Sequence, residues 1–188
     1  KNKNHPIAAN NSSKTALTWG KYLFPMSQYY NIWDTGINTV LFRYAEVLLC
    51  YAEAENELNG PSDDVYDKLN LIRNRVGMPH VDVAKYNTQD KLRELIRRER
   101  SIEMAGEGLR RADILRWRDA AGKMLAETLL NGDLLRPMGT IDYAEANPYK
   151  RAVVNPNRKV LIEPRSFAPY NRYLPIPQKY RDLNDKLE

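Results

Sequence analysis

Between residues 39 and 58 the hydrophobic positions recur every three or four residues, which predicts an α-helix over that range. At about 100° per residue, they share one broad arc: Leu41, Tyr44, Ala45, Leu48, Tyr51 and Ala52. Glu55 projects into this arc, where a carboxylate needs a hydrogen-bond donor or must stay protonated. Cys50 lies on the other side, among charged residues. An arc this wide, with a thiol inside the polar sector, favours a helix covered on more than one side, and we expect Cys50 to be buried.

A second helix is expected over residues 62–76. Asn59-Gly60-Pro61 ends the first helix, because Gly suits a left-handed cap and Pro cannot continue a helix. Ser62 can then cap the second helix, and Gly77 with Pro79 ends it. Two antiparallel helices joined by so short a turn have the dimensions of one tetratricopeptide repeat. The tetratricopeptide sequence signature is absent, so this is a prediction of shape.

A third helix is expected over residues 88–105, with Thr88 as its N-terminal cap. Its apolar stripe continues into two carboxylates at helical spacing: Leu92, Ile96, Glu99 and Glu103. One interpretation is a solvated charged helix, because half of the residues between 93 and 116 are charged. We favour the other, in which Glu99 and Glu103 form buried ion pairs, since an unpaired buried charge costs several kcal/mol. The leading candidate partners are Arg43, Arg110 and Arg116.

Regular structure should become scarce after a fourth helix, which we expect over residues 109–130. Prolines recur from Pro137 to Pro177 and should break any regular element, and the strand-like run there is Val160–Ile162. We therefore predict a mainly α protein, with tetratricopeptide-like helical hairpins wrapped by long irregular Pro-rich segments and few strands. The expected division is an aromatic-rich approach loop at 1–38, a helical core at 39–132 and a wrapping tail at 133–188, together one domain of a longer chain.

The approach loop carries the candidate ligand-binding residues, because aromatic side chains there lie between Pro, Gly and Asn. The best candidates are Trp33, Tyr29 and Tyr30, with Trp19 next. One interpretation is that these rings anchor the loop onto the helices. The other is that some are exposed and stack on a ligand, since loops held by rigid helices often carry binding residues.

Charge and composition exclude several functions. The net charge is +5, but Lys and Arg alternate with Asp and Glu, which argues against a nucleic-acid surface. Cys50 is the single cysteine, and His5 and His80 lie far apart, so we expect no internal disulfide, no metal site and no cofactor. Glu99 and Glu103 lack a partner that would activate water, and no nucleophile–base pair or phosphate loop is evident. An enzyme is therefore not expected.

Four blocks of sequence, in this order, resemble the carboxy-terminal region of the SusD/RagB family. They are RYAEVLLCYAEAENELN (Arg43–Asn59), LNLIRNRVGMP (Leu69–Pro79), IRRERSIEMAGEGLRRADILRW (Ile96–Trp117) and RYLPIPQ (Arg172–Gln178). Gly20-Lys21-Tyr22 also fits the entry to the family's first helix in this region. The blocks cover most of residues 20–183, so the resemblance is specific.

The resemblance implies a non-enzymatic binding protein on the cell surface of Bacteroidetes, seated on a SusC-like TonB-dependent transporter. It implies attachment to the outer membrane through a lipid anchor upstream of Lys1, and no apolar run here approaches the roughly 18 residues of a membrane-spanning helix. Members usually bind glycans and sometimes peptides. Glycan capture for uptake is therefore the expected function, and the alternative is a helical-repeat scaffold that binds peptides or proteins.

Overall fold

The computed structural model describes residues 21–22, 38, 40–146, 150–184 and 186. The chain divides into two compact units, one of residues 21–111 and one that includes residues 112–188. Helices make up most of the regular structure in the described residues, which confirms a mainly α protein. The boundary between the units falls within α4 (Arg110–Arg116), and the predicted borders at 38 and 132 stay predictions.

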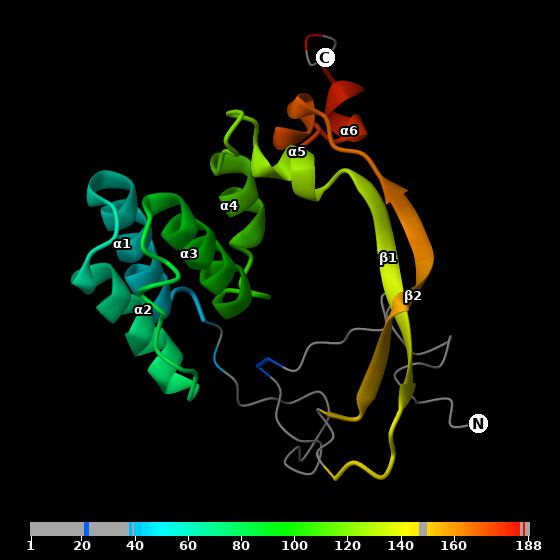
Figure 1. Ribbon diagram of the computed structural model, residues 1–188. Helices are drawn as coiled ribbons and strands as arrows, with labels where there is room; N and C mark the ends of the chain where they lie inside the picture. The colour runs from blue at the N-terminus through cyan, green and yellow to red at the C-terminus, as the bar shows by residue number, and fades with distance from the viewer. Residues whose placement is uncertain (1–20, 23–37, 39, 147–149, 185, 187–188) are drawn as a thin grey trace. The chain divides into compact units, whose positions relative to one another are not determined.

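Three helices build the unit of residues 21–111: α1 (Tyr44–Asn59), α2 (Asp63–Arg75) and α3 (Gln89–Glu103). The first packs against both of the others (Figure 1). Their buried side chains meet in one core with Val81 of the loop after α2 and Met104, directly after α3. The helix residues of this core are Leu48, Leu49, Ala52, Val65, Tyr66, Leu69, Ile72, Leu92, Leu95 and Ile96. All three helices were predicted, although α1 begins later than expected.

Side-chain hydrogen bonds explain where these helices begin and end. Ser62 and Thr88 each accept a hydrogen bond from the backbone N–H three residues further on, which confirms both predicted caps. Gly60 follows α1 with φ +80°, a conformation that disfavours any residue with a Cβ atom. Asn56 and Gln89 then join the end of α1 to the start of α3, because each side-chain amide donates to the other residue's carbonyl, at 3.1 and 2.7 Å.

One side of α1 is exposed, contrary to the sequence prediction. Its buried face consists of Leu48, Leu49, Ala52 and Asn56. Tyr44 and Tyr51, which belong to the predicted apolar arc, are 70% and 44% exposed. Cys50 is exposed as well, so the prediction of a buried thiol is wrong. The reason is that α2 and α3 cover α1 from one side only, although its sequence is apolar around most of its circumference.

The predicted helix over residues 109–130 is also wrong, because a turn separates α4 from a short α5 (Leu125–Leu129). In that turn the carboxylate of Asp119 accepts hydrogen bonds from backbone N–H groups two and four residues further on, both at 2.9 Å. Gly122 completes the turn with φ +77°. An aspartate that binds its own backbone, followed by a left-handed glycine, stabilises a turn in place of a helix.

A small core holds the second unit together around Ile114, Met124, Ala126 and Phe167. The side chain of Asn131 fixes the backbone of Phe167 beside this core. Its Oδ1 accepts a hydrogen bond from the Phe167 N–H at 2.7 Å, and its Nδ2 donates to the Phe167 carbonyl at 2.9 Å.

The Pro-rich tail forms an antiparallel ribbon where irregular structure was predicted. Figure 1 shows β1 (Gly132–Ile141) and β2 (Ala152–Arg165) side by side as one long twisted ribbon. Pro137 and Pro164 lie inside these strands. Both strands of a two-stranded ribbon are edges, where a residue without an N–H is tolerated, and the register shifts directly after Pro137.

The chain continues into a 3₁₀ helix, η3 (Pro169–Arg172), and a short α6 (Gln178–Arg181). The described strands lie within the tail, as expected from the sequence. In the part of the chain that the structure describes, every helix is too short or too polar to cross a bilayer.

Candidate functional site

The aromatic side chains predicted to contact a ligand, Trp19, Tyr29, Tyr30 and Trp33, lie outside the described residues. Their role stays a prediction. The described residues of the first unit contain two further features of functional interest: an ion-pair network at the end of α3 and a cleft beside α3.

Arg43, directly before α1, contacts two carboxylates at the end of α3. Its Nη1 donates to Glu103 Oε1 at 2.8 Å, and its Nη2 donates to Glu107 Oε1 at 2.7 Å and to the Glu103 carbonyl at 2.9 Å. Its Nε lies 3.0 Å from Glu107 Oε2. A planar guanidinium presents five N–H donors in a fixed fork, so it can donate to two carboxylates at once. The structure thus brings together Arg43 and Glu103, both named from the sequence, and adds Glu107, which sequence reasoning missed.

Lys21 and Tyr22, which lie far from α3 in the sequence, also belong to this network. The Lys21 ammonium forms an ion pair with Glu107 and donates to the Glu103 carbonyl at 2.6 Å. Burial raises the pKa of Glu107, but hydrogen bonds from Arg43, Lys21 and Tyr22 outweigh it and bring the pKa to about 2. The hydrogen bond to Glu107 in turn raises the pKa of Arg43. Glu107 and Arg43 therefore stay ionised at neutral pH, and the network holds residues 21–22 against the end of α3.

The two carboxylates named from the sequence also meet arginines of α2. Glu99 forms an ion pair with Arg73, and Glu103 accepts two hydrogen bonds from Arg75, at 2.8 and 2.9 Å. The Glu99 and Glu103 side chains are only 12% and 13% exposed. Sequence reasoning missed Arg73 and Arg75, although both stand in the last turn of the helix that precedes α3 in the chain.

The remaining candidate arginines, Arg110 and Arg116, belong to α4. Arg116 donates to Asp113, three residues before it, at 3.0 Å, and Arg110 is exposed at the start of α4. The proposed pairing of Arg110 and Arg116 with Glu99 or Glu103 stays a prediction. Helical spacing placed the two glutamates on an inward face, but it could not tell which cations lie across from them.

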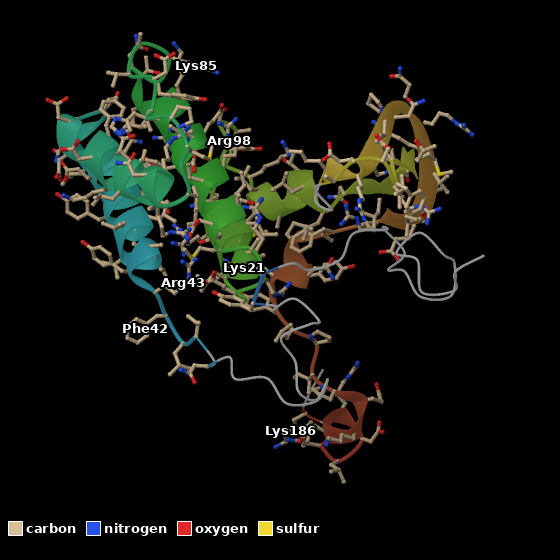
Figure 2. All side chains as sticks on the ribbon, turned by 90° about the horizontal axis from the view of Figure 1, so that it is seen from below. Lys21, Phe42, Arg43, Lys85, Arg98 and Lys186 are labelled. Atoms are coloured by element: carbon tan, nitrogen blue, oxygen red, sulfur yellow. The ribbon has the colours of Figure 1, made fainter. Side chains whose placement is uncertain are left out.

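A cleft of about 550 Å³ lies between the loop of residues 81–88 and α3. Its lining consists of Lys85, Tyr86, Lys91, Glu94, Leu95 and Arg98. The α3 residues among them follow the spacing i, i+3, i+4, i+7, so they share one helix face. Figure 2 shows the side chains of Lys85, from the loop, and Arg98, from α3.

Hydrogen bonds to α2 fix the loop that forms the other wall. The N–H of Val81 donates to the side-chain oxygen of Asn70 at 2.8 Å, and the hydroxyl of Tyr66 donates to the carbonyl of Tyr86 at 2.8 Å. Tyr66 is a buried member of the helix core. The cleft is therefore formed before any ligand arrives, as most small-molecule sites are.

The cleft combines cationic side chains with an aromatic ring, and that combination can bind a polar ligand that also has an apolar face. Its parts come from a loop and a helix that are adjacent in the chain, yet sequence reasoning missed it. The available signal was the grouping of Lys91 and Arg98, seven residues apart on one helical face, directly after a loop that carries Lys85 and Tyr86.

Three packed helices joined to a region of turns and one ribbon define a mainly α protein, and a preformed polar cleft lies beside one of the helices. The family model of the SusD family matches residues 2–188. The chain therefore belongs to the SusD family.

Three relatives from Formosa agariphila are similar to parts of the chain. SusD-like protein P25 is 42% identical over 81 residues, which cover 43% of this chain and 15% of the relative. SusD-like protein P38 is 38% identical over 93 residues, or 46% of this chain and 18% of the relative. SusD-like protein P2 is 38% identical over 114 residues, or 58% of this chain and 21% of the relative. The chain thus matches about a fifth or less of each relative's length. No solved structure matches it.

Proposed function

We infer that the protein of which this chain is a part binds glycans at the cell surface and delivers them to a SusC-like TonB-dependent transporter in the outer membrane. The observation that carries this proposal is membership of the SusD family over residues 2–188. Attachment to the membrane would come from a lipid anchor outside this chain. In this role the protein acts by binding and release, not by catalysis.

The local structure is consistent with such a role. The ion-pair network around Arg43 holds residues 21–22 onto the helix unit, and the approach loop continues from those residues. When a rigid helix unit fixes one end of a loop, ordering the aromatic side chains of that loop on binding costs less conformational entropy. Trp33 and Tyr29 remain the first residues to examine, because flat aromatic faces pack against the C–H side of a pyranose ring.

The test measures glycan affinity and thermal stability of the full-length protein together. Trp33→Ala and Tyr29→Ala should each weaken glycan binding by about tenfold if their rings stack on the ligand, by analogy with the 1–3 kcal/mol of base stacking. Their melting temperatures should not change. Tyr170→Ala is the matched control, because this ring is 75% exposed in η3. Lost stability at unchanged affinity would make Trp33 and Tyr29 anchoring residues, and a full-length protein that binds no glycan would refute the function.

Partnership with the transporter has its own test. A tagged full-length protein should co-purify from solubilised outer membranes with a TonB-dependent transporter, even when glycan is absent. Recovery of the tagged protein without any transporter would refute this part of the proposal.

A second candidate function, a scaffold for peptide or protein partners, is favoured by the exposed side of α1. Tyr44, Val47, Tyr51 and Leu58 repeat there at helical spacing, and each is at least 44% exposed. Apolar faces of this kind can receive an amphipathic helix. Replacing Val47 and Leu58 together by Ser would abolish partner binding and leave glycan affinity unchanged if α1 serves a scaffold. Unchanged binding of every partner would exclude that use of α1.

A further inference from the structure

The cleft between the loop of residues 81–88 and α3 contains cations without acidic partners. Lys85, Lys91 and Arg98 all line it, and none of them forms an ion pair with a carboxylate of the described residues. Glu94 is the acidic residue of the lining, so the six lining residues carry a net charge of about +2 at neutral pH. A concave site with one predominant sign of charge concentrates ligands of the opposite sign.

Two other arginines of α3, Arg93 and Arg100, have acidic partners. Arg93 donates to Glu57 of α1 at 2.7 Å and also forms an ion pair with Asp90. The guanidinium of Arg100 lies 3.8 Å from the carboxylate of Glu46. Lys91 and Arg98 thus differ from these neighbours on α3, and together with Lys85 of the loop they remain available to an anionic ligand.

The cleft also has an apolar wall of fixed geometry. The hydroxyl of Tyr86 accepts a hydrogen bond from Arg98 at 3.4 Å, and the Lys85 ammonium lies 5.3 Å from the centre of the Tyr86 ring. Tyr66 holds the backbone carbonyl of Tyr86, and the Tyr86 side chain packs against the helix core, so the ring has a fixed position. Leu95 adds a second apolar surface. A tyrosine ring next to cations fits a ligand that has both C–H faces and anionic groups.

We propose that this cleft binds an anionic saccharide, whose rings carry carboxylate or sulfate groups. The proposal rests on the glycan-binding function above and names its ligand class. Lys91 and Arg98 hold the anionic groups, and Tyr86 contacts the ring. A volume of about 550 Å³ is within the range of small-ligand sites. The cleft offers no open strand edge to a peptide, so a saccharide is the better match.

The experiment is isothermal titration of the full-length protein with four polymers. Polygalacturonate carries carboxylates, dextran sulfate carries sulfate esters, unmodified dextran is neutral, and polyglutamate is an acidic peptide. We expect binding to at least one of the two anionic polysaccharides, and whichever binds more tightly identifies the anionic group. The affinity should fall as salt rises, because ions screen exposed charges over about 8 Å at physiological ionic strength.

Four variants separate the cleft from the rest of the surface. Lys91→Gln and Arg98→Gln should each weaken binding of the anionic polysaccharide by about tenfold, the usual value for a hydrogen bond to a charged group. Glu94→Gln should strengthen binding several-fold, because it removes the repelling charge. A misfolded variant would not show that increase. Lys159→Gln is the control, because it removes an exposed lysine of β2 and should change nothing.

Several results would overturn the proposal. Binding of neutral dextran but of neither anionic polysaccharide would leave the glycan function in place and refute this ligand class. Equal binding by the wild type, Lys91→Gln and Glu94→Gln would place the anionic ligand elsewhere. Polyglutamate bound as tightly as the polysaccharides, with the same response to the variants, would identify an acidic-peptide site. A protein that binds no saccharide of any kind would refute both the proposal and the function on which it rests.

Discussion

Replacing Arg43 by Met tests whether this arginine is the centre of the network at the end of α3. The methionine keeps an unbranched side chain at this position but cannot donate hydrogen bonds. Arg43 is only 21% exposed, and it donates to Glu103, to Glu107 and to a backbone carbonyl. Its loss leaves two largely buried carboxylates with fewer partners.

The size of the effect follows from the partners that remain. Removing one member of a buried ion pair costs about 3–5 kcal/mol, because the other charge is left buried. Lys21 still contacts Glu107 and Arg75 still contacts Glu103, which places Arg43→Met at the lower end, about 3 kcal/mol. Glu103→Ala should cost less, about 1–2 kcal/mol. In that variant Arg43 keeps Glu107, and Arg75, whose side chain is 56% exposed, returns to water.

The measurement is native-state hydrogen exchange of α1 and α3 amides in the full-length protein, which gives a local free energy of opening even if unfolding is not two-state. Arg43→Met should lower that free energy by more than Glu103→Ala does. Lys159→Gln, which removes an exposed lysine of β2 in the other unit, should leave it unchanged. If Glu103→Ala costs as much as Arg43→Met, or if Arg43→Met costs less than about 1 kcal/mol, the arginine is not the centre of the network.

Three further predictions follow from single positions. Glu107 has a folded-state pKa of about 2, below its ordinary 4.5, so it stabilises the fold above about pH 5 by about 3 kcal/mol, and this is lost as the pH falls towards 2. In urea unfolding, Glu107→Gln should therefore have a lower free energy of unfolding at pH 7 than the wild type. It should also lose less of that free energy as the pH falls from 5 to 2, and the same pH dependence as in the wild type would contradict the prediction. Cys50 should react with a maleimide without denaturant, and labelling only after unfolding would show that its side of α1 is covered in the full-length protein. Gly139→Ala would place a Cβ 2.4 Å from the Val153 carbonyl oxygen, so it should reduce amide protection along β1 and β2, and unchanged protection would show that the ribbon yields easily.

The helices of the first unit could be predicted because their signals are local. Ser62 and Thr88 are side-chain acceptors directly before an apolar stripe, and Gly60 marks the end of α1. The same local rules explain the failure over residues 109–130. The sequence from Asp119 to Gly122 carries a turn signal inside an apolar pattern, and in the structure the turn prevails over helical periodicity.

Other features depend on contacts that periodicity does not encode. The stripe predicted that Glu99 and Glu103 face inward, but Arg73 reaches Glu99 only because α2 and α3 lie in one unit. Cys50 and Tyr51 show the reverse case, in which an apolar sequence predicts burial but the packed neighbours leave that side of α1 open. Proline content likewise excludes central strands, but it does not exclude a ribbon made only of edges.

The cleft could not be read from any one segment, because its position depends on the core beneath it. Tyr66 contributes its ring to the packing of α1, α2 and α3, and the same residue's hydroxyl holds the carbonyl of Tyr86 in the cleft wall. Leu95 likewise faces the core and also lines the cleft. The residues that stabilise the helix unit therefore also set the spacing between the Tyr86 ring and the cations of α3. A ligand held by both would depend on that spacing, so in this protein stability of the helix unit and selectivity of the cleft rest on the same contacts.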